Sequence, residues 1–284
     1  MRVFYDKRQS VKDNQSFSPS SQKSALLAAE WKRLGLPVDI QTFKPATRSE
    51  LYQVHDREYV DGVLDLNRDN GYGNRNPKVA QSLPWVVGSF LNAVKYSMKT
   101  RQDSWSLTSG AHHAHKSYGS GFCSFNFLML GALAAKNLGA KKIILIDLDR
   151  HAPDGCRQIQ KEIGLSELSI YAFGDQMLQT VEDTEGWLKK LPPILLSLCD
   201  GADLVFFNAG VDPATTDFLG GLMTAEQMSR RDRLVFETAK MFNVPVVVSL
   251  AGGYSRDSKG TPRPTVELHT ETMRQHLLVH GVQS

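Results

Sequence analysis

The chain alternates short apolar runs with longer segments that are apolar at helical spacing. Three of the short runs are almost uninterrupted, as expected for strands that helices cover on both faces. These runs are Lys142–Ile146 (KIILI), Leu204–Phe207 (LVFF) and Val244–Leu250 (VPVVVSL). Weaker strand candidates lie at Val3–Tyr5, Val38–Phe43, Trp105–Thr108 and Leu168–Phe173.

The segments between these runs favour helices. The expected helices are Ser21–Leu34, Arg48–Leu66, Pro84–Met98, Phe127–Leu138 (closed by Gly139), Thr224–Phe242 and Glu267–His280. Repeated alternation of strand and helix implies parallel pairing with right-handed crossovers. The pattern therefore predicts an α/β protein, a three-layer α/β/α sandwich around a central, mostly parallel sheet. With no internal repeat or shift in composition, a single domain over residues 1–284 is expected.

Composition narrows the class of protein further. Hydrophobic residues make up 41% and charged residues 22%, the balance of an ordinary globular protein. A net charge of +3 is too small to favour a nucleic-acid partner. Neither a signal peptide nor an apolar run of the roughly 18–20 residues of a membrane span is evident. The three cysteines show no CxxC spacing, which suits a reducing compartment. A cytoplasmic protein without a membrane partner is expected, and its oligomeric state is left open.

Polar residues gather just past the expected strand ends, where functional groups of open parallel sheets lie. Asp147, Asp149, His151 and Asp154 follow KIILI, and Asp212 follows LVFF. A His112-His113 pair follows Trp105–Thr108, and Gly252-Gly253-Tyr254 follows VPVVVSL. Each acid alone is equally well explained as a helix cap or turn residue. Their concentration at four strand ends favours a catalytic site.

Asp149, His151 and Asp212 suit a catalytic metal. Asp149 and His151 are two apart, so on extended backbone their side chains point the same way. Together with Asp212 they supply three ligands and leave a position open for water and substrate, as a catalytic zinc requires.

The histidine pair and the tyrosine suit acid–base and oxyanion chemistry. His112 and His113 can act as general base and general acid, and Asp147 and Asp154 remain to orient them. The plainer alternative is one buried and one exposed imidazole. Tyr254, beside two glycines, can donate to an oxyanion or simply pack at a turn.

These motifs resemble the histone deacetylase and acetylpolyamine amidohydrolase superfamily, in order and spacing. The matching segments are Leu51–Val63, Ser109–Ala114 (SGAHHA), Gly121–Cys123 (GFC), Ile146–Gly155 (IDLDRHAPDG), Asn208–Asp212 (NAGVD) with Asp217, and Gly252–Tyr254 (GGY). They cover most of the chain. The stretch Asp217–Phe236 looks closest to the class IV branch.

The resemblance implies zinc-dependent hydrolysis of an acyl-amine to a free amine and a carboxylate. It assigns one Zn²⁺ to Asp149, His151 and Asp212, and members of the family often carry a structural K⁺ as well. It also implies pairing of His112 with Asp147 and of His113 with Asp154. It assigns substrate contacts to four residues. The carbonyl of Gly121 would accept the amide N–H, Phe122 would form one wall of the channel, Tyr254 would donate to the scissile carbonyl, and Gly252 would also contact the substrate.

The chain departs from the family at a few positions. Ala152-Pro153 replaces the frequent second histidine and glycine, Phe127 stands where Asp is common, and Ser18-Pro19 replaces His-Pro. The rim loop reads Asn74–Pro77, with Arg75 and no carboxylate to grip a peptide. An acyl-lysine or small acylated amine is therefore expected as substrate, with little dependence on flanking sequence.

Other functions fit the sequence less well. An acetylpolyamine amidohydrolase is one alternative, although Arg75 would repel a polycation. A two-metal, arginase-like enzyme needs a ligand where Pro153 stands. A non-catalytic protein of the same fold would be expected to lose one of His112, His113 and Tyr254, and a nucleotide-binding domain would need the GxGxxG motif that is missing here.

Overall fold

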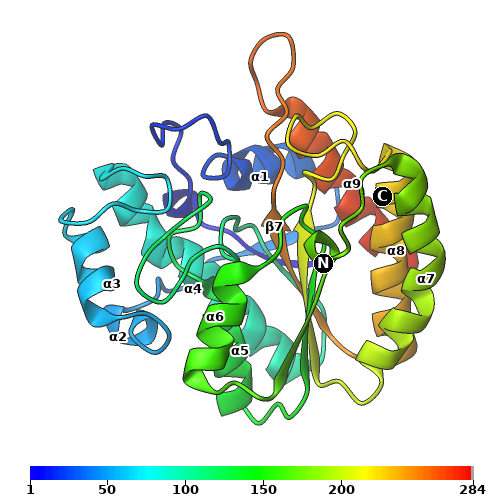
Figure 1. Cartoon of the computed structure of the whole chain (residues 1–284), viewed down its shortest axis with the longest axis horizontal. Helices are drawn as coiled ribbons and strands as arrows, with labels where there is room; N and C mark the ends of the chain where they lie inside the picture. Colours follow the sequence, from blue (N-terminus) through cyan, green and yellow to red (C-terminus); the bar gives the residue numbers. More distant parts are fainter. Residues whose placement is uncertain (283–284) are drawn as a thin grey trace.

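Seven parallel strands form one sheet in the computed structural model, which describes residues 1–282. The strands are β1 (Arg2–Phe4), β2 (Asp39–Gln41), β3 (Ser104–Ser106), β4 (Ile143–Asp147), β5 (Leu168–Ala172), β6 (Leu204–Gly210) and β7 (Val246–Ala251). Their order across the sheet is β2-β1-β3-β7-β6-β4-β5, and every pairing is parallel. The predicted parallel sheet is confirmed (Figure 1).

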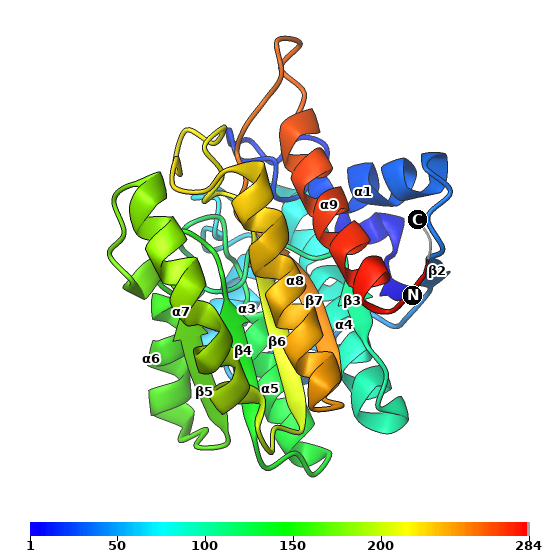
Figure 2. The same ribbon diagram turned by 90° about the vertical axis from the view of Figure 1, so that its right-hand side faces the viewer.

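Helices cover both faces of this sheet (Figure 2). One group consists of α1 (Lys23–Arg33), α7 (Val181–Cys199), α8 (Ala225–Met241) and α9 (Arg263–Val279). The other consists of α2 (Arg48–Leu51), α3 (Arg57–Leu64), α4 (Pro77–Thr100), α5 (Phe127–Asn137) and α6 (Asp154–Ile163). Short 3₁₀ turns lie at Lys7–Gln9 and Phe173–Asp175. The three-layer α/β/α sandwich predicted from the alternating pattern is therefore present.

Two hydrophobic cores explain why the central strands are so apolar. Every residue of β4, β6 and β7 is buried, because alternate side chains enter opposite cores. Ile144 and Ile146 join the core under α1, α7, α8 and α9, whereas Ile143 and Leu145 join the core under α2 to α6.

The expected helix Arg48–Leu66 is divided into α2 and α3. The chain breaks before Asp56, the extended N-cap of α3. The break carries His55 into the core, where its Nε2 accepts a hydrogen bond from the Asn126 backbone (2.8 Å) and its Nδ1 lies 2.9 Å from the carbonyl of His115. Because these partners lie far along the chain, helical spacing alone does not reveal the break.

Helices α4 and α7 also differ from their sequence patterns, and prolines are the cause. Helix α4 begins at Pro77, where the Asn76 side chain accepts from the Lys78 backbone (2.9 Å), and not at the internal Pro84. Proline is common in the first turn of a helix, so either proline was a plausible start. Helix α7 was not identified, because it runs through Pro192 and Pro193, which normally interrupt helices.

The carboxyl ends of the strands lie at one edge of the sheet, so the loops after β3, β4, β6 and β7 converge there (Figure 1). Among residues 1–282, no helix combines the length and apolar character needed to cross a membrane.

Candidate active site

Asp149, His151 and Asp212 meet where β4 and β6 end. Nδ1 of His151 lies 3.1 Å from Oδ1 of Asp149 and 3.1 Å from Oδ2 of Asp212. Both carboxylates are buried, whereas the imidazole is 42% exposed. One ligand atom from each of the three residues lies within 4.8 Å of the other two. The predicted trio is thus assembled, with one side open to solvent.

The polar contacts of this trio suit a bound cation. Nδ1 carries at most one hydrogen and lies within hydrogen-bond distance of Oδ1 of Asp149, whereas Oδ2 of Asp212 is buried without a hydrogen-bond partner. Burial and the charge of Asp149 raise the pKa of Asp212, as expected for buried carboxylates without a counter-ion. One nitrogen and two oxygen donors with an open side fit a catalytic zinc.

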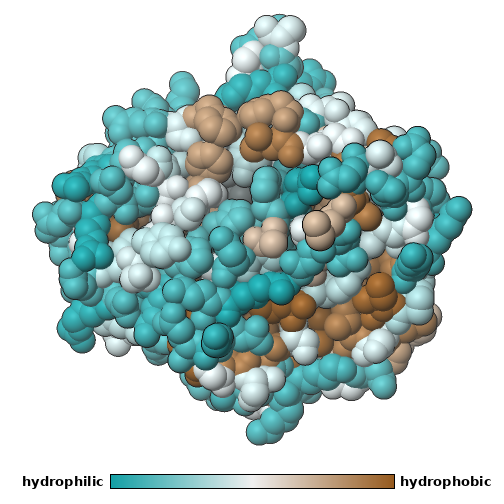
Figure 3. All heavy atoms as spheres, in the orientation of Figure 1, coloured by the Kyte–Doolittle hydropathy of each residue, from teal (hydrophilic) through white to brown (hydrophobic). Residues whose placement is uncertain are grey.

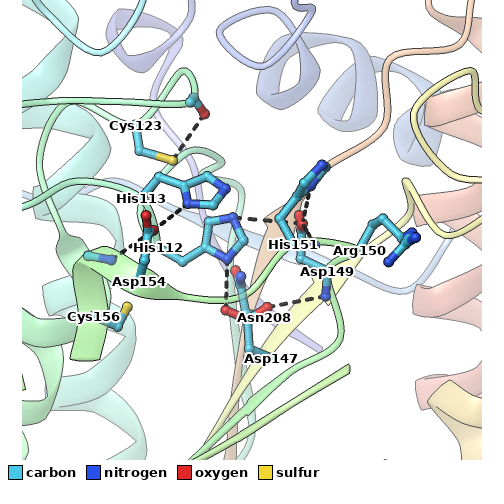
Figure 4. A network of polar contacts seen from close by, with 12 residues as sticks. His112, His113, Cys123, Asp147, Asp149, Arg150, His151, Asp154, Cys156 and Asn208 are labelled. Atoms are coloured by element: carbon cyan, nitrogen blue, oxygen red, sulfur yellow. Dashed lines mark hydrogen bonds and ion pairs between the residues drawn. The ribbon is translucent and has the colours of Figure 1, made fainter. Parts of the chain in front are cut away.

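Two histidine–aspartate pairs stand beside Asp149 and His151 (Figure 4). Nδ1 of His112 lies 3.0 Å from Oδ2 of Asp147, and Nδ1 of His113 lies 2.6 Å from Oδ1 of Asp154. The two rings are adjacent, with centroids 4.1 Å apart. In each ring the aspartate holds a hydrogen at Nδ1, which leaves Nε2 available for a second contact. The pairing expected from the family resemblance is the one observed.

The two imidazoles differ in their electrostatic surroundings. Burial lowers the pKa of His112, but Asp147 and Asp149 outweigh it, and the pKa is raised to about 9. Burial, followed by repulsion from His112, lowers the pKa of His113. The carboxylates around His112 thus favour its charged form, whereas the surroundings of His113 favour a neutral ring.

Glycines bring the Tyr254 loop against the trio. Gly252 has a φ of +47°, and a Cβ there would lie 2.1 Å from Oδ1 of Asp212, so a side chain would displace the carboxylate. Asp217 anchors the loop by accepting hydrogen bonds from the backbones of Tyr254 (2.6 Å) and Ser255 (3.1 Å). The buried Lys23 donates to the carbonyl of Gly252. Burial raises the pKa of Tyr254 and so keeps its phenol protonated as a donor.

Gly121 and Phe122 lie beside the same loop. Gly121 has a φ of +53°, and a Cβ there would lie 2.5 Å from the His113 ring. The ring of Phe122 lies 5.6 Å from that of Tyr254 and 5.1 Å from that of Phe17, whose ring is also 5.8 Å from that of Phe218. We refer to Phe17, Phe122, Phe218 and Tyr254 as the aromatic collar. Figure 3, in the orientation of Figure 1, shows a group of apolar residues near the upper centre of this face of the molecule.

Several residues of this region were not identified from the sequence. Phe17 and Phe218 are 54% and 66% exposed, and Lys23 and Arg231 are buried behind the trio. Phe218 and Arg231 lie within the stretch Asp217–Phe236 that resembles the family, but no role follows for either from that resemblance, and Phe17 and Lys23 lie outside every matching segment. Phe17 and Phe218 could have been noticed as large apolar residues in loop segments. Lys23 could have been noticed as a basic residue at a helix position where the spacing calls for an apolar one.

The rim loop carries the expected Arg75, but a carboxylate that the loop itself lacks lies beside it. Nε of Arg75 lies 2.8 Å from Oδ1 of Asp69, and both side chains are exposed. The positive charge of Arg75 is therefore balanced by the carboxylate of Asp69, just before the rim loop. This pairing weakens the expected repulsion of a polycation.

A second aspartate–histidine cluster lies at the opposite end of the sheet. Asp103, His276 and His280 also have the spacing of metal ligands. The indole of Trp105 donates to Nδ1 of His276 (2.8 Å), so Nε2 carries the hydrogen that is donated to Asp103 (2.7 Å). A protonated Nε2 has no lone pair for a metal. Within residues 1–282, the trio at the strand ends is the better metal candidate.

Known proteins resemble this chain in both sequence and fold. Residues 17–178 match the family model described as "Histone deacetylase domain". An uncharacterized protein of Picosynechococcus sp. is 31% identical over 76% of this chain and 80% of its own length. Histone deacetylase 2 of Arabidopsis thaliana is 28% identical over 64% of this chain and 51% of its own length. The crystal structure of the HDA15 HD domain superposes with a TM-score of 0.77 at 20% identity, over 99% of this chain and 91% of that one. The chain thus spans most of the first relative and about half of the second.

Proposed function

The chain belongs to the histone deacetylase family, and on that premise we propose that it is a zinc-dependent deacylase that hydrolyses an acyl-amine to a free amine and a carboxylate. One observation carries the proposal. The buried Asp149 and Asp212 carboxylates converge on Nδ1 of His151, and two histidine–aspartate pairs stand beside them. This combination suits hydrolysis, because it joins a metal site to groups that transfer protons.

Asp149, His151 and Asp212 would hold the zinc. Once bound there, it would lower the pKa of a coordinated water and polarise the substrate carbonyl. The carboxylates are already buried and facing one another, so little rearrangement is needed for them to serve as ligands. The residue two past His151 is Pro153, which offers no side-chain ligand for a second metal.

His112 and His113 would move the protons. Their Nδ1 atoms are held by Asp147 and Asp154, so Nε2 is the atom of each ring that can take a proton from water or deliver one to the departing amine. The phenol of Tyr254 would donate to the oxyanion that forms as water adds to the carbonyl.

The aromatic collar and Gly121 would select the substrate. The collar groups four aromatic rings, one of them Tyr254 on the loop that contacts Asp212, which suits an extended apolar stem that ends in an amide. The carbonyl of Gly121 would accept the amide N–H. Arg75 holds Oδ1 of Asp69, and the rim pair has no net charge, so we expect only a weak grip on the N–H groups of a peptide. An acyl-lysine or small acylated amine is therefore the proposed substrate.

The test combines metal analysis with a substrate panel. We expect one zinc per chain and comparable kcat/KM for free acyl-lysine and for acyl-lysine peptides of varied sequence. Phe17→Ala and Phe218→Ala should each raise KM several-fold, whereas Met241→Ala, another exposed apolar residue, should not. A strong preference for acetylpolyamines would favour the alternative substrate class. Two transition metals per chain, or full activity after removal of the metal, would refute the proposal.

A further inference from the structure

Arg231, a fully buried arginine of α8, reaches the ends of two strands. Its Nη1 donates to the carbonyl of Gly210 (2.9 Å), the last residue of β6, and to the carbonyl of Leu148 (3.1 Å), the first residue after β4. Asp149 follows Leu148 directly, and Asp212 lies two residues beyond Gly210. One guanidinium thus joins the two segments that carry the carboxylates of the metal trio.

The sheet itself does not fix the spacing of these segments. The β4–β6 ladder ends at the pairing of Asp147 with Asn208, followed by one hydrogen bond from Leu148 to Asn208 (3.1 Å). Beyond that point the two backbones are in direct contact, since a Cβ on Gly210 would lie 2.3 Å from Cα of Asp149. The carbonyls of Leu148 and Gly210 are therefore joined through Arg231 and not by the strand ladder.

Arg231 is itself held in place from behind. Its Nε donates to Oδ1 of Asp232 (2.8 Å), and Oδ2 of Asp232 accepts from the hydroxyl of Thr272 (2.7 Å) on α9. All three side chains are buried. Because the guanidinium is planar and its donors have a fixed geometry, a bond to Asp232 on one side determines where Nη1 points on the other.

We propose that Arg231 is a positioning residue for the metal centre, which holds the backbones before Asp149 and Asp212 at the spacing that lets both carboxylates bind one ion. The proposal rests on the proposed function, because it takes those two carboxylates as ligands. A purely structural role would be to neutralise Asp232 inside the protein. That role would affect the stability of the fold but not the affinity for metal.

The primary variant is Arg231→Lys, which keeps a positive charge beside Asp232 and so leaves no unpaired buried carboxylate. A single ammonium cannot reproduce the fork that reaches both carbonyls and the carboxylate. We expect zinc affinity, measured by chelator competition, to fall about 10-fold, the lower end for residues that support metal ligands. The visible absorption of the Co²⁺-loaded protein should change as well, because it reports on ligand geometry.

A matched control is Asp103→Asn, which disturbs the other aspartate–histidine cluster, at the far end of the sheet. It should lower the unfolding temperature of the metal-free protein and leave both the zinc affinity and the Co²⁺ spectrum unchanged. If Arg231→Lys does not fold, Thr272→Val loosens Asp232 without removing a charge and should weaken zinc binding by a smaller factor in the same direction.

The positioning role is overturned if folded Arg231→Lys, or Thr272→Val in its place, has the zinc affinity of the unmodified protein and gives the same Co²⁺ spectrum. Failure of the proposed function has a different signature. In that case the unmodified protein would bind zinc independently of Asp212 or would hydrolyse no acyl-amine.

Discussion

Two aspartate–histidine clusters lie at opposite ends of the same sheet, and their hydrogen bonds differ. At the amino end, both ring nitrogens of His276 have partners, Trp105 on one side and Asp103 on the other. At the carboxyl end, His151 Nδ1 faces two carboxylates at equal distance, and one oxygen of Asp212 has no hydrogen-bond partner.

The difference indicates which of the two clusters is the better candidate for a metal site. Spacing alone qualifies both clusters as metal sites. A buried polar group that has no partner costs free energy, so it points to a ligand that completes it. The carboxyl-end cluster has such a group, whereas the hydrogen bonds of His276 are complete.

The largest expected effect comes from removing a carboxylate of the trio. Asp212→Ala should abolish zinc retention and hydrolysis, because the site would keep only two ligands. Elemental analysis and a hydrolysis assay measure the two effects. Asp103→Asn is the matched change at the other cluster and should keep both properties. If Asp103→Asn lost the zinc instead, the assignment of the two clusters would be reversed.

The next effect concerns proton transfer. His113→Ala should reduce kcat by about 10²–10⁴-fold, the usual contribution of a general acid or base, while zinc content stays at one per chain. Steady-state kinetics with metal analysis on the same sample provides the test. Loss of zinc from this variant would show that His113 is a ligand and that the trio is misassigned.

A smaller loss is expected at the oxyanion donor. Tyr254→Phe removes one hydroxyl and keeps the ring that packs on Phe122. We expect kcat to fall by about 10²–10³-fold, with KM, zinc content and unfolding temperature nearly unchanged. A variant with normal kcat would make Tyr254 a packing residue of the collar.

The smallest effect is on stability, at the amino-end cluster. Burial would raise the pKa of Asp103, but hydrogen bonds from His276 and His280 outweigh it and lower the pKa. A lowered pKa in the folded state adds stability above the pKa of the unfolded chain, about 3.9, and this contribution is lost as the pH falls through the folded-state pKa.

Near neutral pH, Asp103→Asn should therefore lower the free energy of unfolding by about 1.5–3 kcal/mol, the range for hydrogen bonds to a charged group. Denaturant unfolding of the metal-free protein at a series of pH values measures this cost. The difference in free energy of unfolding between the unmodified protein and Asp103→Asn should narrow as the pH falls below about 4. A gap that stays constant down to strongly acidic pH would show that the charge of Asp103 contributes no stability.

The sequence predicted those features that depend on local pattern. The continuous apolar runs located β4, β6 and β7, because strands buried on both faces need such runs. The trio and the histidine pairs could be named because they lie at the carboxyl end of a strand or in the loop that follows it. Their roles stay predictions until the variants above are measured.

The remaining features depend on packing between distant segments. Arg231 reaches Leu148 across 83 positions of the chain, and Lys23 reaches Gly252 across 229. Phe17 joins the collar from a turn before α1 that carries no motif. Neither spacing nor propensity encodes such contacts, because they arise only once helices of one layer pack on the strand ends.

The strand order has a consequence for how the chain is made. Strand β7 lies between β3 and β6, so β2-β1-β3 and β6-β4-β5 are joined within the sheet only through this late segment. While the ribosome synthesises the first 240 or so residues, each half of the sheet has an open edge that awaits β7. An unpaired edge is a site of aggregation, so a chain that stalls before Val246 should depend on chaperones far more than the completed protein does.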